Sequence, residues 1–198
     1  MVDEHAGDRA DPTALEYGRP RRRKRKRPPY KLIAILLALA LLIAVLLPDS
    51  VYRGESIRRS SCASHLRLIG QALLFHGYNH GGKYPDTIEG LLEDDIGPDV
   101  FVCPDTTDTK ATGATTQAVA ADMAKPGHLS YVYLGKGFTN KCSPDTVLVY
   151  EPLANHSNAG SNVLFGDGRV SFIPAASMKK ILAELAAGQN PPPSAKGL

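Results

Sequence analysis

The sequence contains few cysteines and lacks the short motifs that would assign it a familiar chemistry. Its 198 residues include three cysteines and no Cys-x-x-Cys pair, so it has neither a zinc-finger signature nor a site for covalent haem attachment. A Gly-x-Ser-x-Gly nucleophile elbow, a phosphate-binding loop and a zinc-protease motif are also missing. Hydrolase and nucleotide-binding functions therefore receive no positive support from motifs.

An excess of positive charge is lacking outside the N-terminal region: residues 1–48 contain 10 Lys and Arg against 5 Asp and Glu, whereas residues 49–198 contain 13 against 15. The net charge is +3, and 9 of the 23 Lys and Arg residues fall between Arg19 and Lys31. Residues 21–27 are all basic, and residues 32–47 then follow without one polar side chain. A basic block beside an uninterrupted apolar run argues against a wholly soluble protein, and it favours a role in membrane topology over nucleic-acid binding.

The apolar run predicts a single membrane span. At about 1.5 Å per residue the run reaches about 24 Å, short of a hydrocarbon core of about 30 Å. Tyr30, Lys31 and Tyr52 can extend it by lying at the two membrane interfaces. We therefore expect a transmembrane signal anchor over residues 30–52. The alternatives are a cleaved signal peptide, for which no small-x-small site follows, a buried core helix and a nucleic-acid arm.

The flanking charges predict the orientation and the domain boundaries. By the positive-inside rule, we expect the N-terminus in the cytoplasm, one span in the cytoplasmic membrane, and the remainder of the chain outside the cytoplasm. We expect a disordered cytoplasmic tail over residues 1–29, with the basic block 19–31 contacting anionic lipid. An extracytoplasmic domain is expected over residues 53–188, followed by a disordered Pro-rich tail over residues 189–198.

The extracytoplasmic part predicts an α+β fold that begins with a long helix. Residues 55–78 have helical periodicity, with one apolar stripe made by Cys62, Leu66, Ile69 and Leu73. This helix starts close to the anchor, so the two can form one nearly continuous element. A second, shorter helix is expected after Asp86, which would be its N-cap and form a capping box with Glu89.

Strand signals dominate the second half of the domain. Four short β-branched or aromatic runs are bounded by Gly, Pro or Asn, at residues 131–134, 146–150, 162–165 and 170–173. Residues 105–128 are polar and are expected to form a loop, and residues 175–187 predict a C-terminal helix. The expected architecture is a long N-terminal helix packed on a small antiparallel sheet, plus the C-terminal helix.

Segments spread over about residues 58–173 together resemble one bacterial family. They are residues 62–73, 82–86, 101–104 and 130–133, and His156 followed by residues 162–170 with Asp167-Gly168. This combination resembles the pseudopilin-like exported domains of bacterial prepilin-type proteins, in particular the group with a His…Asp-Gly motif. The resemblance implies a pilin-like fold and a non-enzymatic component or accessory of a type II secretion or type IV pilus-like system. Envelope or secretion proteins would then be its partners.

The span departs from that of a prepilin. A prepilin has a Gly before its cleavage point and a Glu near the start of its hydrophobic helix. Here the span begins Lys31-Leu32-Ile33 and contains no carboxylate. The resemblance therefore implies a pseudopilin-like domain on a signal anchor that is not cleaved, and filament assembly by the prepilin route is not expected.

The His…Asp-Gly region is the main candidate site. His156 and Asp167 could share a metal or act as an acid–base pair, and Glu151 and Asn162 add possible oxygen ligands. The metal candidates are thus Glu151, His156 and Asp167, with Ca²⁺ as one possible ion, although we expect no cofactor. The competing interpretation is structural, because Asp167-Gly168 suits a tight hairpin turn. The alternative function is an exported metal-dependent or hydrolytic enzyme that uses His156 and Asp167.

The three cysteines all lie in the part expected to be exported, where an oxidising compartment permits one disulfide. Cys62 lies on the core face of the long helix, and Cys103 lies in a short Val-Cys-Pro turn. We predict a Cys62–Cys103 disulfide with Cys142 unpaired, and a Cys103–Cys142 disulfide is the alternative. The expected role is structural, since the bond would hold a loop against the helix.

Overall fold

The computed structural model describes residues 30–197, except for the side chains of residues 45–55. It divides into two units, residues 1–45 and residues 46–198. The predicted cytoplasmic tail over residues 1–29 lies outside the described residues, as do the side chains in the second part of the predicted span. Among the residues that are described, no helix is both long and apolar enough to cross a membrane.

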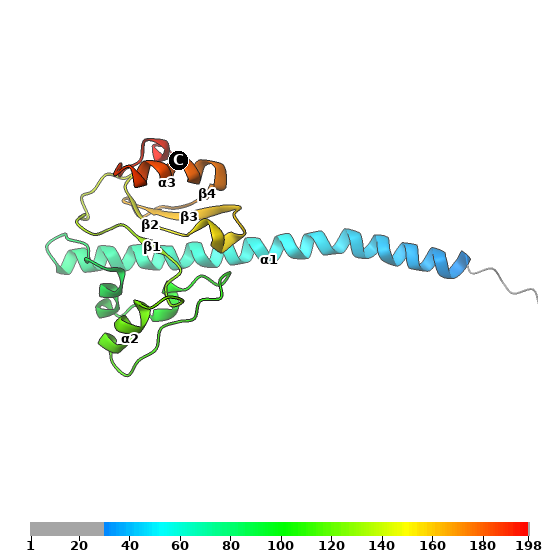
Figure 1. The fold of residues 1–198 in the computed structure, drawn as a ribbon, viewed down its shortest axis with the longest axis horizontal. Coiled ribbons are helices and arrows are strands. Elements are labelled where there is room, and N and C mark those ends of the chain that lie inside the picture. Colours follow the sequence, from blue (N-terminus) through cyan, green and yellow to red (C-terminus); the bar gives the residue numbers. More distant parts are fainter. Residues whose placement is uncertain (1–29, 198) are drawn as a thin grey trace, which may run out of the picture. The chain divides into compact units, whose positions relative to one another are not determined.

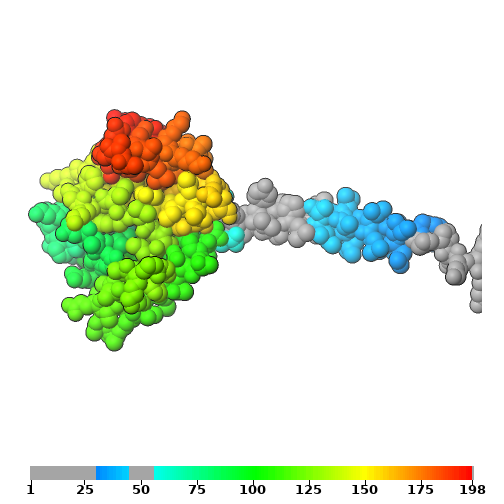
Figure 2. Space-filling view, in the orientation of Figure 1, coloured from blue at the N-terminus to red at the C-terminus, as the bar shows by residue number. Residues whose placement is uncertain are grey.

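The first and longest element is α1, Tyr30–Asn79, a helix of 50 residues. Figure 2 shows the segment before residue 45 in blue with its surface open. Its large apolar side chains are exposed, and Leu41, for example, is 69% accessible. Further along, the predicted stripe of Cys62, Leu66, Ile69 and Leu73 is completely buried, which confirms the helical periodicity. A methyl group at Gly70 would come within 3.0 Å of Leu164 Cδ1, so this glycine lets α1 lie close to the sheet.

The sheet has four antiparallel strands in the order β1-β2-β3-β4. All four coincide with the predicted runs to within two residues at each end; they are β1 Val132–Tyr133, β2 Val147–Tyr150, β3 Gly160–Phe165 and β4 Val170–Pro174. The central strand β3 is completely buried, because α1 covers one face of the sheet and α3, Ala175–Ala186, covers the other (Figure 1). Leu164 packs with the α1 stripe, whereas Val163 and Phe165 pack with α3.

The segment between α1 and the sheet differs from the expectation. The predicted α-helix capped by Asp86 is instead a 3-10 helix, η1, Ile88–Asp94, and its N-cap is Thr87, which makes no side-chain capping bond. Gly90 lies in its middle, and glycine disfavours a regular α-helix. The expected loop 105–128 contains the helix α2, Thr116–Met123, whose N-cap Thr115 accepts a hydrogen bond from the Ala118 amide.

The C-terminal tail also differs from the expectation of disorder. Residues 193–195 form the 3-10 helix η4, Pro193–Ala195, and Ala195 is completely buried against the core that α3 shares with the sheet. Asn190 exchanges two hydrogen bonds of 2.8 Å with the backbone of Val147. These contacts keep the Pro-rich segment on the domain, even though its composition is typical of a free tail.

Candidate functional site

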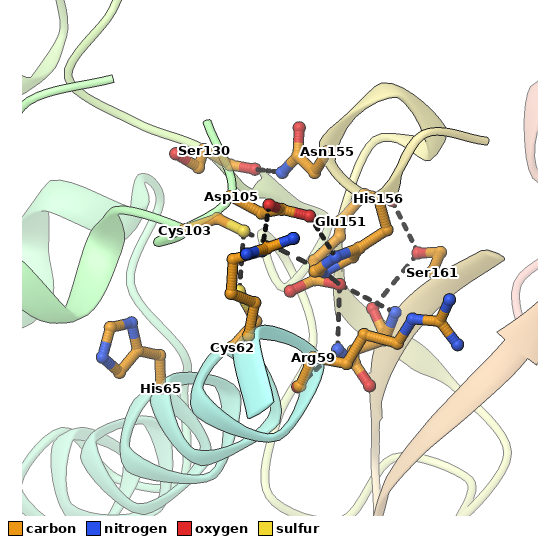
Figure 3. Close-up of polar contacts among 12 residues, drawn as sticks. Arg59, Cys62, His65, Cys103, Asp105, Ser130, Glu151, Asn155, His156 and Ser161 are labelled. Carbon is orange, nitrogen blue, oxygen red and sulfur yellow. Dashed lines mark hydrogen bonds and ion pairs between the residues drawn. The ribbon is translucent and has the colours of Figure 1, made fainter. Parts of the chain in front are cut away.

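Four buried side chains from distant parts of the sequence meet between α1 and the sheet. Cys62, Cys103, Glu151 and His156 are each 0% exposed. One potential ligand atom of each lies within 4.8 Å of the others. Figure 3 shows these side chains pointing toward one another, and we call them the Cys–His–Glu site.

Each member is positioned by a different element. Cys62 begins the buried stripe of α1, and Cys103 follows the 3-10 helix η2, Pro98–Phe101. Glu151 comes directly after β2, and His156 ends the 3-10 helix η3, Leu153–His156. The site therefore depends on the packing of the long helix against the β2–β3 connection.

The side chains are within contact distance. The Cys62 and Cys103 sulfur atoms are 2.6 Å apart, although both residues are free thiols in the structure. His156 Nε2 lies 3.0 Å from Glu151 Oε2 and 4.0 Å from Cys103 Sγ. The imidazole thus faces a carboxylate and a sulfur atom with the same nitrogen.

A surrounding set of polar groups orients the site. His156 Nδ1 lies 3.2 Å from Asp105 Oδ2, and Arg58 forms an ion pair of 2.5 Å with the other oxygen of Asp105. The Arg58 Nε makes no hydrogen bond, so the contact with Asp105 is one of charge without hydrogen-bond alignment. On the other side, the amide nitrogen of the Asn162 side chain donates to Glu151 Oε2 at 3.0 Å and to the Arg59 carbonyl at 3.1 Å.

One oxygen of the site is left without a partner. Glu151 Oε2 accepts from the Asn162 backbone and side chain, but Glu151 Oε1 is buried and has no hydrogen-bond partner among the described residues. A buried carboxylate oxygen without a partner is costly, so its presence requires an explanation.

The two thiols have opposite pKa shifts. The hydrogen bond with Cys62 lowers the pKa of Cys103 to about 6, against the effect of desolvation by burial. The same hydrogen bond and burial raise the pKa of Cys62 well above its ordinary value. These directions correspond to a Cys103 thiolate that accepts a hydrogen bond from the Cys62 thiol.

The imidazole is held in its charged form. Desolvation by burial lowers the pKa of His156, but its hydrogen bonds to Cys103 and Glu151 outweigh that effect and raise the pKa to about 10. A protonated His156 can donate from Nδ1 to Asp105 and from Nε2 to Glu151. Without a bound cation, the site thus consists of a buried imidazolium among acidic groups.

Asp167, the other half of the predicted pair, belongs to a different part of the domain. It lies in the β3–β4 turn, where its carboxylate accepts hydrogen bonds from the Arg169 backbone at 3.0 Å and guanidinium at 2.8 Å. These bonds lower the pKa of Asp167, although desolvation by burial opposes them. His156 precedes β3 and Asp167 follows it, and the six residues of this strand span about 20 Å at ~3.3 Å per residue.

The structure thus favours the structural interpretation of the Asp-Gly pair. Gly168 has φ +85°, a conformation that side chains rarely adopt, and Arg169 also contacts Asp145 at 2.7 Å. Of the predicted metal candidates, Glu151 and His156 lie together, and Asp167 lies apart from them. Asn162, the remaining motif residue, is 2% exposed and supports Glu151.

The structure places the predicted disulfide partners Cys62 and Cys103 next to each other, and the bond itself stays a prediction. Cys142 is partly exposed in the loop between β1 and β2 and is not a member of the Cys–His–Glu site. Sequence analysis missed the two cysteines as companions of His156, because their separations along the chain match no known ligand spacing. The sequence did indicate Glu151 with His156 as metal candidates, and Cys62 with Cys103 as a pair, but it did not indicate that the two pairs meet.

A small surface groove lies beside Asn162, one of the residues that contact the site. It has a volume of about 320 Å³ and is lined by residues that include Arg59, Asn162 and Phe172. Asn162 both lines this groove and donates a hydrogen bond to Glu151 Oε2.

Comparison of the chain with protein-family models finds no match, and comparisons with curated proteins and with solved structures find none either.

Proposed function

We propose that the chain is a single-pass membrane protein whose pseudopilin-like domain lies outside the cytoplasm. In this proposal it acts without catalysis, as a component or accessory of a type II secretion or type IV pilus-like envelope system. The observation that carries the proposal is the division of α1, which exposes apolar side chains near its N-terminus and buries an apolar stripe against the sheet further on.

Support for the anchor comes from the exposed apolar surface before residue 45. Side chains there are 46–69% accessible; they are Tyr30, Leu32, Ile33, Ile35, Leu36, Leu37, Leu39, Leu41, Leu42 and Ile43. So large an apolar surface is unfavourable in water and favourable in lipid. The basic residues 19–31 would hold this segment with its N-terminus in the cytoplasm.

Support for a non-enzymatic role comes from the two residues that an enzyme would have used. His156 is completely buried, so a substrate has no direct access to its imidazole. Asp167 is ion-paired with Arg169 in a turn. Neither arrangement suits an acid–base pair acting on a common substrate.

Support for an assembly role comes from the outer face of α1 in the domain. Leu68, Phe75 and Tyr78 are 45%, 56% and 84% exposed, and their spacing places them along one side of the helix. An envelope or secretion protein with an apolar surface could pack against this side, while the opposite side of α1 remains in the core.

The anchor and its orientation are tested with the full chain fused at its C-terminus to alkaline phosphatase, which is active only after export. We expect active phosphatase in the membrane fraction, resistant to carbonate extraction. Replacing Leu36, Leu37 and Leu41 together by Arg should release the protein from the membrane, and replacing the same residues by Ile should not. Inactive phosphatase or a soluble wild-type protein would contradict the proposal.

The assembly role is tested by a photo-reactive amino acid in the membrane-bound chain in its own host. At Phe75 we expect one discrete crosslinked product whose partner is an envelope or secretion protein. The matched control is Lys180, which is exposed on α3. Equal crosslinking at both positions, or crosslinking at neither, would argue against α1 as the assembly surface.

A further inference from the structure

We infer that Cys62, Cys103, Glu151 and His156 bind one zinc ion, which joins α1 to the β2–β3 connection. This site goes beyond the proposed function, and it does not depend on the membrane anchor. The inference rests on the donor atoms, their distances, the surrounding hydrogen bonds and the unpartnered oxygen of Glu151.

The donor set suits zinc. Zinc in proteins takes four tetrahedral ligands drawn from cysteine sulfur, histidine nitrogen and carboxylate oxygen. The site offers two sulfur atoms, one imidazole nitrogen and one carboxylate, all completely buried. Calcium and magnesium prefer oxygen ligands alone, so two sulfur atoms exclude them as the natural occupants.

The distances leave room for the ion after small movements of the ligands, of which the largest separates the two sulfur atoms. Around a tetrahedral zinc, two thiolates lie about 3.8 Å apart and a thiolate and an imidazole nitrogen about 3.6 Å apart. Cys103 Sγ and His156 Nε2 are 4.0 Å apart, close to that value. The two sulfur atoms are 2.6 Å apart and must separate by about 1 Å. Rotation of the Cys103 side chain, which extends from a loop, can supply this movement.

The hydrogen bonds around His156 and Glu151 already orient these side chains as metal ligands. A zinc-bound histidine usually donates its other ring N–H to a carboxylate, which fixes the tautomer and the ring orientation. Here His156 Nδ1 faces Asp105, and Arg58 holds that carboxylate. His156 Nε2 is therefore directed at the sulfur atom and at Glu151. Asn162 fixes the Glu151 carboxylate through Oε2 in the same way.

The unpartnered oxygen is an independent indication of a missing ligand. Glu151 Oε1 is buried without a hydrogen-bond donor, and the Glu151 side chain is 0% exposed. A cation in the site would give this carboxylate the positive partner that the described residues do not provide to Oε1.

Charge and protons balance when zinc enters. The ion takes the place of the proton on the Cys62 thiol and of the proton on His156 Nε2, and both protons pass to solvent. Two positive charges replace two protons, so the net charge of the buried group is unchanged. Since four protein ligands complete the coordination, the ion would have no open position for substrate and would be structural.

Oxidation of the same two thiols is the competing outcome. A Cys62–Cys103 disulfide would remove both sulfur ligands, and an oxidising compartment favours it. The two states are mutually exclusive, so a single preparation can distinguish them by metal content and by the number of free thiols.

The experiment uses the full chain, purified in detergent under anaerobic conditions without chelators. We expect one zinc per chain by elemental mass spectrometry and three free thiols after denaturation in a chelator. Replacing zinc with Co(II) should produce thiolate-to-metal charge-transfer bands and the visible bands of tetrahedral cobalt. Free zinc at 100 times Kd should raise the Tm of the metal-free protein by about 5–10 °C.

Matched variants identify the ligands. Cys103→Ser should abolish the cobalt charge-transfer bands or reduce their intensity to that of a single thiolate ligand. Cys142→Ser should retain zinc and the full band intensity. Where Cys103→Ser does not fold, Glu151→Gln keeps the side-chain volume and should weaken zinc binding by about 100-fold or more. A zinc content below one tenth per chain together with a mapped Cys62–Cys103 disulfide would overturn the inference. Equal loss of metal in Cys103→Ser and Cys142→Ser would do so as well.

Discussion

The two ends of β3 contain the two halves of one sequence motif, yet they are chemically unlike. His156, before the strand, is completely buried, and its polar contacts come from Cys103 and Asp105 in the loop after η2 and from Glu151 after β2. Asp167, after the strand, is 38% exposed and contacts Arg169, two residues away. Two residues that are close in sequence thus do not form a joint site when a strand separates them.

The largest expected effect comes from removing the buried histidine. His156→Ala leaves the Glu151 and Asp105 carboxylates without their shared cationic partner, and we expect the free energy of unfolding of the metal-free, reduced protein to fall by about 3–5 kcal/mol. Urea unfolding of the full chain in detergent measures this loss. His128→Ala serves as a control, because His128 lies in a partly exposed hydrogen bond with Thr109. A loss below about 1 kcal/mol would show that the imidazolium is not essential to the packing of this end of β3.

A smaller effect is expected from pH in the same metal-free, reduced protein. The pKa of His156 is raised from 6.5 to about 10 in the folded state. Its contribution to the free energy of unfolding is therefore full below pH 6.5 and is lost as pH rises through 10. The pKa of Cys103 is lowered from 9.0 to about 6, so its contribution is full above pH 9 and is lost as pH falls through 6.

The two trends oppose each other between pH 6.5 and 9 and leave stability nearly constant there. Above pH 9 the decline from His156 continues. Cys62 adds to it, because its thiol ionises in the unfolded chain while its raised pKa keeps it protonated in the folded state. The groups that face the imidazole are Asp105, Glu151 and Cys103. We expect stability to fall from pH 9 to pH 10, as measured by urea midpoints, and the fall should be smaller in His156→Ala. Constant stability across that interval would contradict an imidazolium in the site.

The smallest effect is expected at the other end of the strand. Asp167→Ala removes a partly exposed ion pair with Arg169, which keeps its contact with Asp145, so we expect a loss of less than about 1 kcal/mol. Thermal or urea unfolding compared with wild type checks the value. If Asp167→Ala were as damaging as His156→Ala, the two ends of β3 would share a function after all.

Much of the fold was predictable because it depends on local patterns. The stripe of Cys62, Leu66, Ile69 and Leu73 follows helical periodicity, and the turn at Asp167-Gly168 follows from residues that adopt its backbone conformation. The capped helix at Asp86 was not predicted correctly, because a capping pattern says nothing about the glycine and the packing that make the segment a 3-10 helix. The tail beyond residue 188 packs through Asn190 and Ala195, contacts that its composition does not reveal.

The α+β fold class, the helix stripe, the four strands and the β3–β4 turn follow from local patterns in the amino-acid sequence, because each depends on residues close together in the chain. The position of His156 beside Cys62, Cys103 and Glu151, and apart from Asp167, follows from long-range packing. Those contacts join residues up to 94 positions apart, and they exist because α1 packs across the β2–β3 connection.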